Sequence, residues 1–178
     1  MQLRDYQIDI STRAADILRQ HGVVYLSMQV RTGKTLTALQ TAANIETKQV
    51  LFVTKKKAIS SIDTDIELFS PSYKIAVTNY EQLHKIQPGF DVVIVDEAHS
   101  LGAFPKPSNR AEELKRICAN NCKVIYLSGT ATPESYSQFY HQFYITENGP
   151  WNAYTNFYKW AKDYVTVGKL YVLSLIHI

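Results

Sequence analysis

Short apolar runs alternate with amphipathic stretches along most of the chain. Five of the runs are rich in β-branched and aromatic residues, a composition typical of strands buried on both faces. They occupy residues 23–30, 50–54, 73–78, 90–95 and 123–127. Helix-like segments separate them, and this alternation predicts an α/β fold, a mainly parallel sheet with helices on both faces.

The amphipathic stretches predict helices at residues 3–21, 58–69 and 110–119, one after Gly33, a short one from Asn79, and one after Thr132-Pro133. In the first, the apolar stripe of Tyr6, Ile10, Ala14 and Ile17-Leu18 places Gln7 on the exposed side. Asn109 with Glu112, and Thr132 with Pro133, read as helix starts.

From Trp151 onward the chain becomes aromatic. The favoured interpretation is that these rings pack a terminal helix onto the sheet. The alternative is that the rings, with Lys159 and Lys162, form a stacking platform for single-stranded bases.

Composition narrows the class of protein. The 178 residues suit one domain, and a net charge of +3 leaves nucleic-acid binding to a local patch rather than a global field. Cys118 and Cys122 are too few for a zinc site and suggest reduced, partly buried thiols in a cytoplasmic protein. No secretory signal and no membrane-length apolar run is visible in the sequence.

A Gly-Lys-Thr tripeptide, residues 33–35, follows the first predicted strand and opens a helix. This context favours a phosphate-binding loop, because a helix N-terminus presents free N–H groups and a positive dipole end. Lys34 would reach the phosphates and Thr35 would ligate Mg²⁺. Met28 stands where the phosphate-loop pattern has its first glycine, so a chance match at a helix start stays open.

Asp96 and Glu97 end the apolar strand at residues 90–95. A carboxylate at the carboxyl end of a strand can hold Mg²⁺, and its neighbour can polarise an attacking water, although a polar strand end is the plain alternative. Ser128 and Thr130 follow the last strand, and Lys55 to Lys57 follow the second. We expect all of these side chains along one edge of the sheet.

Taken together, these motifs resemble the first RecA-like lobe of a superfamily 2 helicase or translocase over nearly all of residues 1–145. The matching segments are Leu3-Arg4-Asp5-Tyr6-Gln7, Arg31 to Thr35, Val50 to Lys57, Thr78 to Glu81, Asp96 to His99 and Ser128-Gly129-Thr130. The segments at residues 79–81 and 128–135 look closest to those of phage helicases related to the chromatin-remodeller type.

The resemblance implies ATP and Mg²⁺ as cofactors, a nucleic-acid partner with DNA favoured over RNA, and a soluble location in the cytoplasm (the host's, if phage-encoded). It also implies a role for each matching residue. For the nucleotide, Gln7 would read adenine, and the phosphates would be surrounded by Arg31, Thr32, Gly33, Lys34 and Thr35. Mg²⁺ would be held by Thr35 and Asp96, and the attacking water would be activated by Glu97. Nucleotide state would be coupled to movement by His99, Ser128 and Thr130, and nucleic acid would be faced by Lys55, Lys56, Asn79 and Tyr80.

Two other functions stay open on the sequence: a P-loop enzyme acting on a small molecule, and a non-catalytic nucleic-acid-binding module. Family members need a second RecA-like lobe, so we expect this chain to be a fragment in which residues 146–172 extend toward that lobe. Residues 173–178 match the translation of a sequencing-library adapter and are expected to be an artefact. A genuine apolar strand is the alternative.

Overall fold

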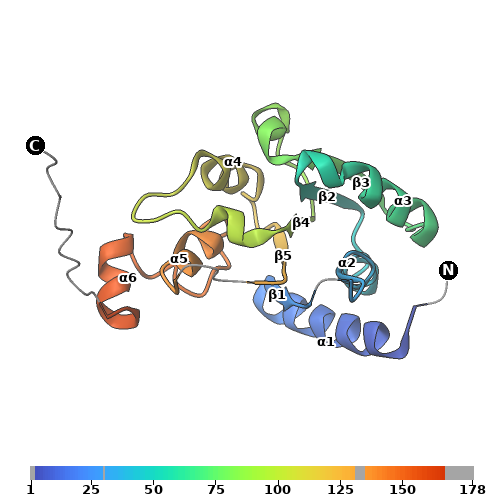
Figure 1. The fold of residues 1–178 in the computed structure, drawn as a ribbon, viewed down its shortest axis with the longest axis horizontal. Helices are drawn as coiled ribbons and strands as arrows, with labels where there is room; N and C mark the ends of the chain where they lie inside the picture. Colours follow the sequence, from blue (N-terminus) through green and yellow to red (C-terminus); the bar gives the residue numbers. More distant parts are fainter. Residues whose placement is uncertain (1–2, 30, 131–134, 167–178) are drawn as a thin grey trace, which may run out of the picture.

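A five-stranded sheet, with every pairing parallel, forms the centre of the molecule (Figure 1). The computed structural model describes residues 3–29, 31–130 and 135–166. The strand order is β1-β5-β4-β2-β3. The strands are β1 (Val23–Ser27), β2 (Gln49–Thr54), β3 (Lys74–Asn79), β4 (Val92–Asp96) and β5 (Lys123–Ser128). All five predicted strands are therefore present, with ends that differ by a few residues.

Helices cover both faces of this sheet (Figure 1). The α-helices are α1 (Asp5–His21), α2 (Lys34–Asn44), α3 (Ile59–Phe69), α4 (Asn109–Ile117), α5 (Gln138–Phe143) and α6 (Phe157–Tyr164). Short 3-10 helices are η1 (Lys56–Ala58), η2 (Tyr80–Lys85) and η3 (Ala98–Leu101). One core cluster joins the sheet to α1, α2 and α3, and another joins it to η2, η3 and α4. The predicted fold class is confirmed.

The buried face of α1 differs from the predicted stripe. Tyr6 and Ile17 are exposed, whereas Ala14 and Leu18 are buried together with Gln7 and two small residues, Ser11 and Ala15. Small side chains allow α1 to lie close against α2, and burial follows that contact rather than hydrophobicity alone. The expectation that Gln7 lies on the exposed side was wrong: only 4% of it is exposed.

Helix starts were predicted with mixed success. Asn79 caps η2 as expected, since its side chain accepts hydrogen bonds from the backbone N–H groups of Glu81 and Gln82. The cap of α4 is Ser108, whose hydroxyl accepts from the N–H of Ala111, and not the predicted Asn109. The predicted start at Thr132-Pro133 lies outside the described residues, and so does the suspected tail at residues 173–178.

The aromatic stretch after Trp151 packs mainly against α5 rather than directly on the sheet. Trp160 of α6 is buried in a cluster with Tyr140 of α5, and the ring of Trp151 lies 5.1 Å from that of Trp160 and 5.3 Å from that of Phe143. Packing, the favoured interpretation, is thus confirmed, and its target is corrected. We call the segment from residue 135 to 166, which contains α5 and α6, the aromatic module.

Cys118 and Cys122 are free thiols that form no disulfide bond in the described part of the chain. Cys118 ends α4 and Cys122 precedes β5, and both are buried, more completely than expected from the sequence. None of the helices in the described part of the chain is long and apolar enough to cross a membrane.

Candidate active site

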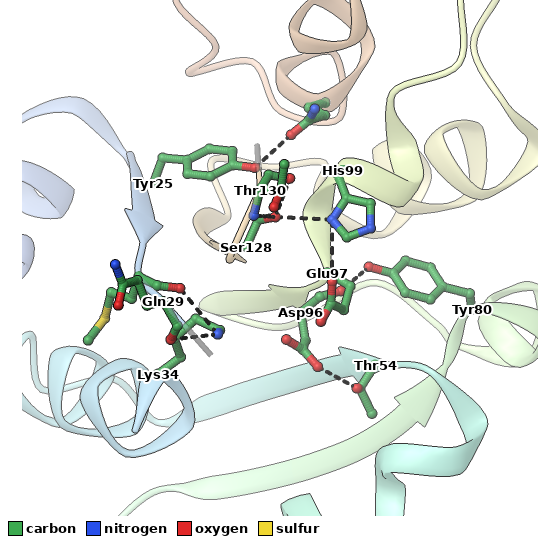
Figure 2. Close-up of polar contacts among 12 residues, drawn as sticks. Tyr25, Gln29, Lys34, Thr54, Tyr80, Asp96, Glu97, His99, Ser128 and Thr130 are labelled. Carbon is green, nitrogen blue, oxygen red and sulfur yellow. Dashed lines mark hydrogen bonds and ion pairs between the residues drawn. The ribbon is translucent and has the colours of Figure 1, made fainter. Parts of the chain in front are cut away.

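The carboxyl ends of three adjacent strands bring the candidate residues together. In the order β1-β5-β4, Ser27 is in register with Ser128, and Leu127 with Asp96. The loops that follow these strands therefore leave the sheet side by side at one edge, where ligands of open α/β sheets bind. Figure 2 shows Lys34, Asp96, Glu97, His99, Ser128 and Thr130 around this edge.

The loop after β1 has a backbone suited to close approach. Arg31 and Gly33 have φ angles of 64° and 75°, in the left-handed region that glycine adopts most easily. The ammonium of Lys34 lies over its own loop, where Nζ donates to the carbonyl oxygens of Met28 at 3.3 Å and Gln29 at 3.2 Å (Figure 2). The lysine thus closes the loop on itself at the N-terminus of α2.

Gln7 joins α1 to this loop. Its Oε1 accepts a hydrogen bond from the backbone N–H of Arg4 at 2.9 Å, and its Nε2 donates to the carbonyl of Gly33 at 3.4 Å. A Cβ placed on Gly33 would lie 2.2 Å from Nε2 of Gln7, so glycine is needed here for space as well as for backbone angle. A glutamine at the third position of a helix is one half of a capping box, and this signal could have indicated the bond to Arg4, though not the one to Gly33.

Asp96 is a half-buried carboxylate with two partners that the sequence did not indicate. Its Oδ2 accepts a hydrogen bond from Thr54 Oγ1 at 2.7 Å, and its backbone oxygen accepts one from the hydroxyl of Tyr80 (Figure 2). Burial raises the pKa of Asp96 and the charge of Glu97 raises it further, while the Thr54 hydrogen bond and the charge of Lys34 lower it. A carboxylate in this position is stabilised by any cation that arrives beside it.

Glu97, His99, Ser128 and Thr130 form one hydrogen-bonded group. Nδ1 of His99 lies 3.3 Å from Oε2 of Glu97 and 3.0 Å from Oγ of Ser128 (Figure 2). Because a lone pair on Nδ1 would face the Glu97 carboxylate, we infer that this nitrogen carries the proton. Oγ of Ser128 lies 2.8 Å from the carbonyl oxygen of Thr130 and 3.1 Å from its amide nitrogen.

Thr35, expected to share a metal ion with Asp96, lies near a different carboxyl in this structure, that of Asp65 of α3. Burial raises the pKa of Asp65, and the nearby Thr35 hydroxyl lowers it. Sequence reasoning missed both: Asp65 lies outside the matching segments, and Thr54, inside the segment from Val50 to Lys57, was given no role.

The expected nucleic-acid surface is only partly exposed. Lys55 is half-buried and Lys56 is exposed at the end of β2. Asn79 and Tyr80 are buried, because Asn79 caps η2 and Tyr80 donates its hydroxyl hydrogen to Asp96. The expectation that these two side chains face nucleic acid is therefore corrected: both are committed to internal bonds that support the end of β4.

Comparison with known families bears directly on this arrangement. The family model described as "Type III restriction enzyme, res subunit" (ResIII) matches residues 1–74 and 56–135, which is most of the chain. The chain belongs to the ResIII family. Its fold is that of the first RecA-like lobe of a superfamily 2 helicase.

Relatives of this ResIII chain agree with that assignment. The chain is 28% identical to "Putative helicase 109L" of Invertebrate iridescent virus 3, with 82% of this chain and 50% of that protein covered. It thus spans about half the length of the curated relative it matches.

Two solved structures share the fold of this ResIII lobe. One is the Sulfolobus solfataricus SWI2/SNF2 ATPase core in complex with dsDNA, at 16% identity and a TM-score of 0.69, covering 84% of this chain and 36% of that one. The other is a nuclease-deletion mutant of the Type ISP restriction-modification enzyme LlaGI with a DNA substrate mimic, at 16% identity and a TM-score of 0.53, covering 78% and 19%.

Proposed function

We propose that this chain is the ATP-binding lobe of a DNA-dependent ATPase, a helicase or translocase that hydrolyses ATP with Mg²⁺. The observation that carries the proposal is the half-buried carboxylate of Asp96 at the edge of the sheet where ligands bind. Burial raises its pKa and the charge of Glu97 raises it further, while the Thr54 hydrogen bond and the charge of Lys34 lower it. Membership of the ResIII family supports the same function.

The residues present fit a magnesium nucleotide. Mg²⁺ prefers oxygen ligands and keeps several waters, so one carboxylate and one hydroxyl, from Asp96 and Thr35, are a suitable donor set. The ion would neutralise phosphate charge and stabilise the Asp96 carboxylate. To ligate it, the Thr35 hydroxyl would turn from the Asp65 carboxyl toward the ion.

The loop residues would hold the phosphates through backbone N–H groups of Arg31, Thr32 and Gly33 and through the ammonium of Lys34. In the structure that ammonium is bound by two loop carbonyls, which it would leave for phosphate oxygens. Gln7 would read adenine. Its amide has a second donor hydrogen and a second acceptor position beyond the bonds to Arg4 and Gly33, so both internal bonds can persist.

Glu97 would orient and deprotonate the attacking water. Nδ1 of His99 lies 3.3 Å from one oxygen of this carboxylate, which leaves the other available for that water. His99, Ser128 and Thr130 would then transmit the state of the site, since they form one bonded group with Glu97.

Nucleic acid would bind at the lysines after β2, with DNA favoured over RNA because both structural neighbours were solved with DNA or its mimic. Lys55 and Lys56 would contact phosphates rather than bases. A second RecA-like lobe would complete the ATP site, consistent with a chain that spans half of its viral relative. Residues 146–172 would lead toward that lobe.

Calorimetry with ATP and Mg²⁺, followed by turnover with and without DNA or RNA, tests the proposal in a protein that carries both lobes. We expect Lys34→Ala to abolish nucleotide binding without unfolding the lobe. Lys74→Ala is the matched control, because Lys74 is exposed at the opposite end of the sheet, at the start of β3. Unchanged ATP affinity in a folded Lys34→Ala variant would contradict the assignment. Turnover without nucleic-acid stimulation would indicate a small-molecule P-loop enzyme.

A further inference from the structure

Ser128 has as many hydrogen-bonding partners as a hydroxyl can serve at once. Oγ lies within bonding distance of Nδ1 of His99 and of both the amide nitrogen and the carbonyl oxygen of Thr130. A serine hydroxyl offers one donor and two acceptor positions, and these three groups fill them. The nearby hydroxyl of Tyr25 therefore finds no free position on Ser128 in this arrangement.

Tyr25 connects this serine to the aromatic module. It lies on β1, next to β5, and its ring is stacked on that of Tyr126 at 5.6 Å. Its hydroxyl donates to Oε1 of Gln142 on α5 at 2.9 Å, and Figure 2 shows the hydroxyl beside Ser128. Burial raises the pKa of Tyr25 to about 12, so the hydroxyl keeps its proton and acts as a donor at neutral pH.

The single proton of Tyr25 has two possible acceptors. While His99 donates to Ser128, both acceptor positions of Ser128 are filled, by His99 and by the N–H of Thr130, and the tyrosine proton goes to Gln142. If His99 turns its Nδ1–H to Glu97, which is only 3.3 Å away, one acceptor position on Ser128 becomes free. Tyr25 can then turn its hydroxyl to Ser128, donate to it and release Gln142.

We propose that Tyr25 is a positioning residue that couples the Glu97–His99 pair to helix α5, by exchanging its hydrogen bond between Ser128 and Gln142. The role of Glu97 in this coupling rests on the proposed function; the exchange itself rests on the bonded group. The rings of Phe139 and Phe143 lie 6.0 and 5.9 Å from that of Tyr25, and Phe143 also contacts Trp151. Movement of α5 therefore changes the surroundings of a tryptophan.

The chain has two tryptophans, and both are in the aromatic module, Trp151 and Trp160. Tryptophan emission is therefore a direct measure of the module. We expect His99→Ala to change this emission, and we expect at least about half of that change to disappear when Tyr25→Phe is also present, since residues in one network are not additive. Tyr73→Phe is the matched control: its hydroxyl is also buried and donates to a backbone carbonyl, that of Leu39, on the other face of the sheet.

Gln142→Met removes the other acceptor of the Tyr25 hydroxyl and is a second test of the exchange. It should reduce the change in tryptophan emission caused by His99→Ala in the same way. An equal effect of His99→Ala in the parent, Tyr25→Phe and Gln142→Met backgrounds would overturn the proposal. So would the absence of any emission change in the parent. Circular dichroism establishes which variants are folded, and the cycle is read from the folded ones.

A nucleotide arm separates this inference from the proposed function. Calorimetry measures ADP–Mg²⁺ binding, and tryptophan emission is recorded on the same samples. Binding with an emission change that Tyr25→Phe reduces by about half or more supports both proposals. Binding with an identical change in Tyr25→Phe overturns the relay alone. A chain that binds no nucleotide contradicts the proposed function, while the His99→Ala cycle still decides the role of Tyr25.

Discussion

Thr54 donates its hydroxyl hydrogen to Oδ2 of Asp96 at 2.7 Å, between the neighbouring strands β2 and β4. This bond and the charge of Lys34 only partly offset burial, which leaves the pKa of Asp96 raised above 3.8. A carboxyl whose pKa is raised on folding contributes stability that is complete below its unfolded pKa and is lost as the pH rises through its folded pKa. At neutral pH, Asp96 is therefore a destabilising charge in the nucleotide-free protein.

Asp96→Asn should consequently raise the Tm of the nucleotide-free protein at pH 7, because the amide oxygen still accepts from Thr54 and the buried charge is gone. Each kcal/mol gained corresponds to about 2–4 °C in a domain of this size. The gain should shrink as the pH is lowered toward 3.8, where the carboxyl of the parent is itself protonated. Thermal melts across this range check the expectation; a lower Tm for Asp96→Asn at pH 7 would disprove it.

Gly33→Ala should destabilise the protein for two separable reasons. A φ of 75° costs a residue with a Cβ about 1–2 kcal/mol, and the new Cβ would also meet Nε2 of Gln7 at 2.2 Å. Only the second cost depends on Gln7, so Gln7→Ala should recover part of the loss. Denaturant unfolding of the two single variants and the double variant measures this coupling.

Gly89→Ala is the matched control, because Gly89 also has a positive φ, 133°, but a Cβ there would have no neighbour within 4 Å. The effects of Gly89→Ala and Gln7→Ala should be additive. If Gly33→Ala and Gln7→Ala are equally additive, the close contact between α1 and the loop does not exist in solution.

Removing charge at Lys55 and Lys56 should weaken nucleic-acid binding and make it less dependent on salt. Each lost contact with a phosphate of duplex DNA lowers the slope of log affinity against log salt by about 0.9. Fluorescence anisotropy at several salt concentrations, with Lys55→Ala and Lys56→Ala combined, measures both quantities. Lys74→Ala again serves as the control. An unchanged affinity and slope would exclude this surface.

The strands were predictable because a continuous β-branched run such as Val92 to Val95 removes all its apolar side chains from water only when both faces of the strand are buried. The gathering of Lys34, Asp96 and Ser128 at one edge followed from the parallel arrangement. The predictions that were wrong concern polar residues whose hydrogen-bond partners are distant in sequence. Nothing local reveals that Gln7 reaches Gly33, or that Tyr80 bonds to Asp96.

The same limit explains Tyr25. In the sequence it is one aromatic residue of an apolar strand, and only the pairing of β1 with β5 and the packing of α5 place its hydroxyl beside both Ser128 and Gln142. The approach of Thr35 to Asp65 likewise depends on how α2 packs against α3. Motif spacing identifies chemistry at strand ends, whereas bonds between elements need the tertiary structure.

The most direct test of the central claim is ATP binding and ATP turnover measured on the same Glu97→Gln variant, in a protein with both lobes. The amide keeps the size and shape of the side chain but is not a base, and loss of such a group slows a reaction by about 10²–10⁴-fold. We expect ATP–Mg²⁺ affinity close to that of the parent and turnover reduced by this factor. Turnover equal to that of the parent would show that Glu97 is not the catalytic carboxylate and would contradict the account.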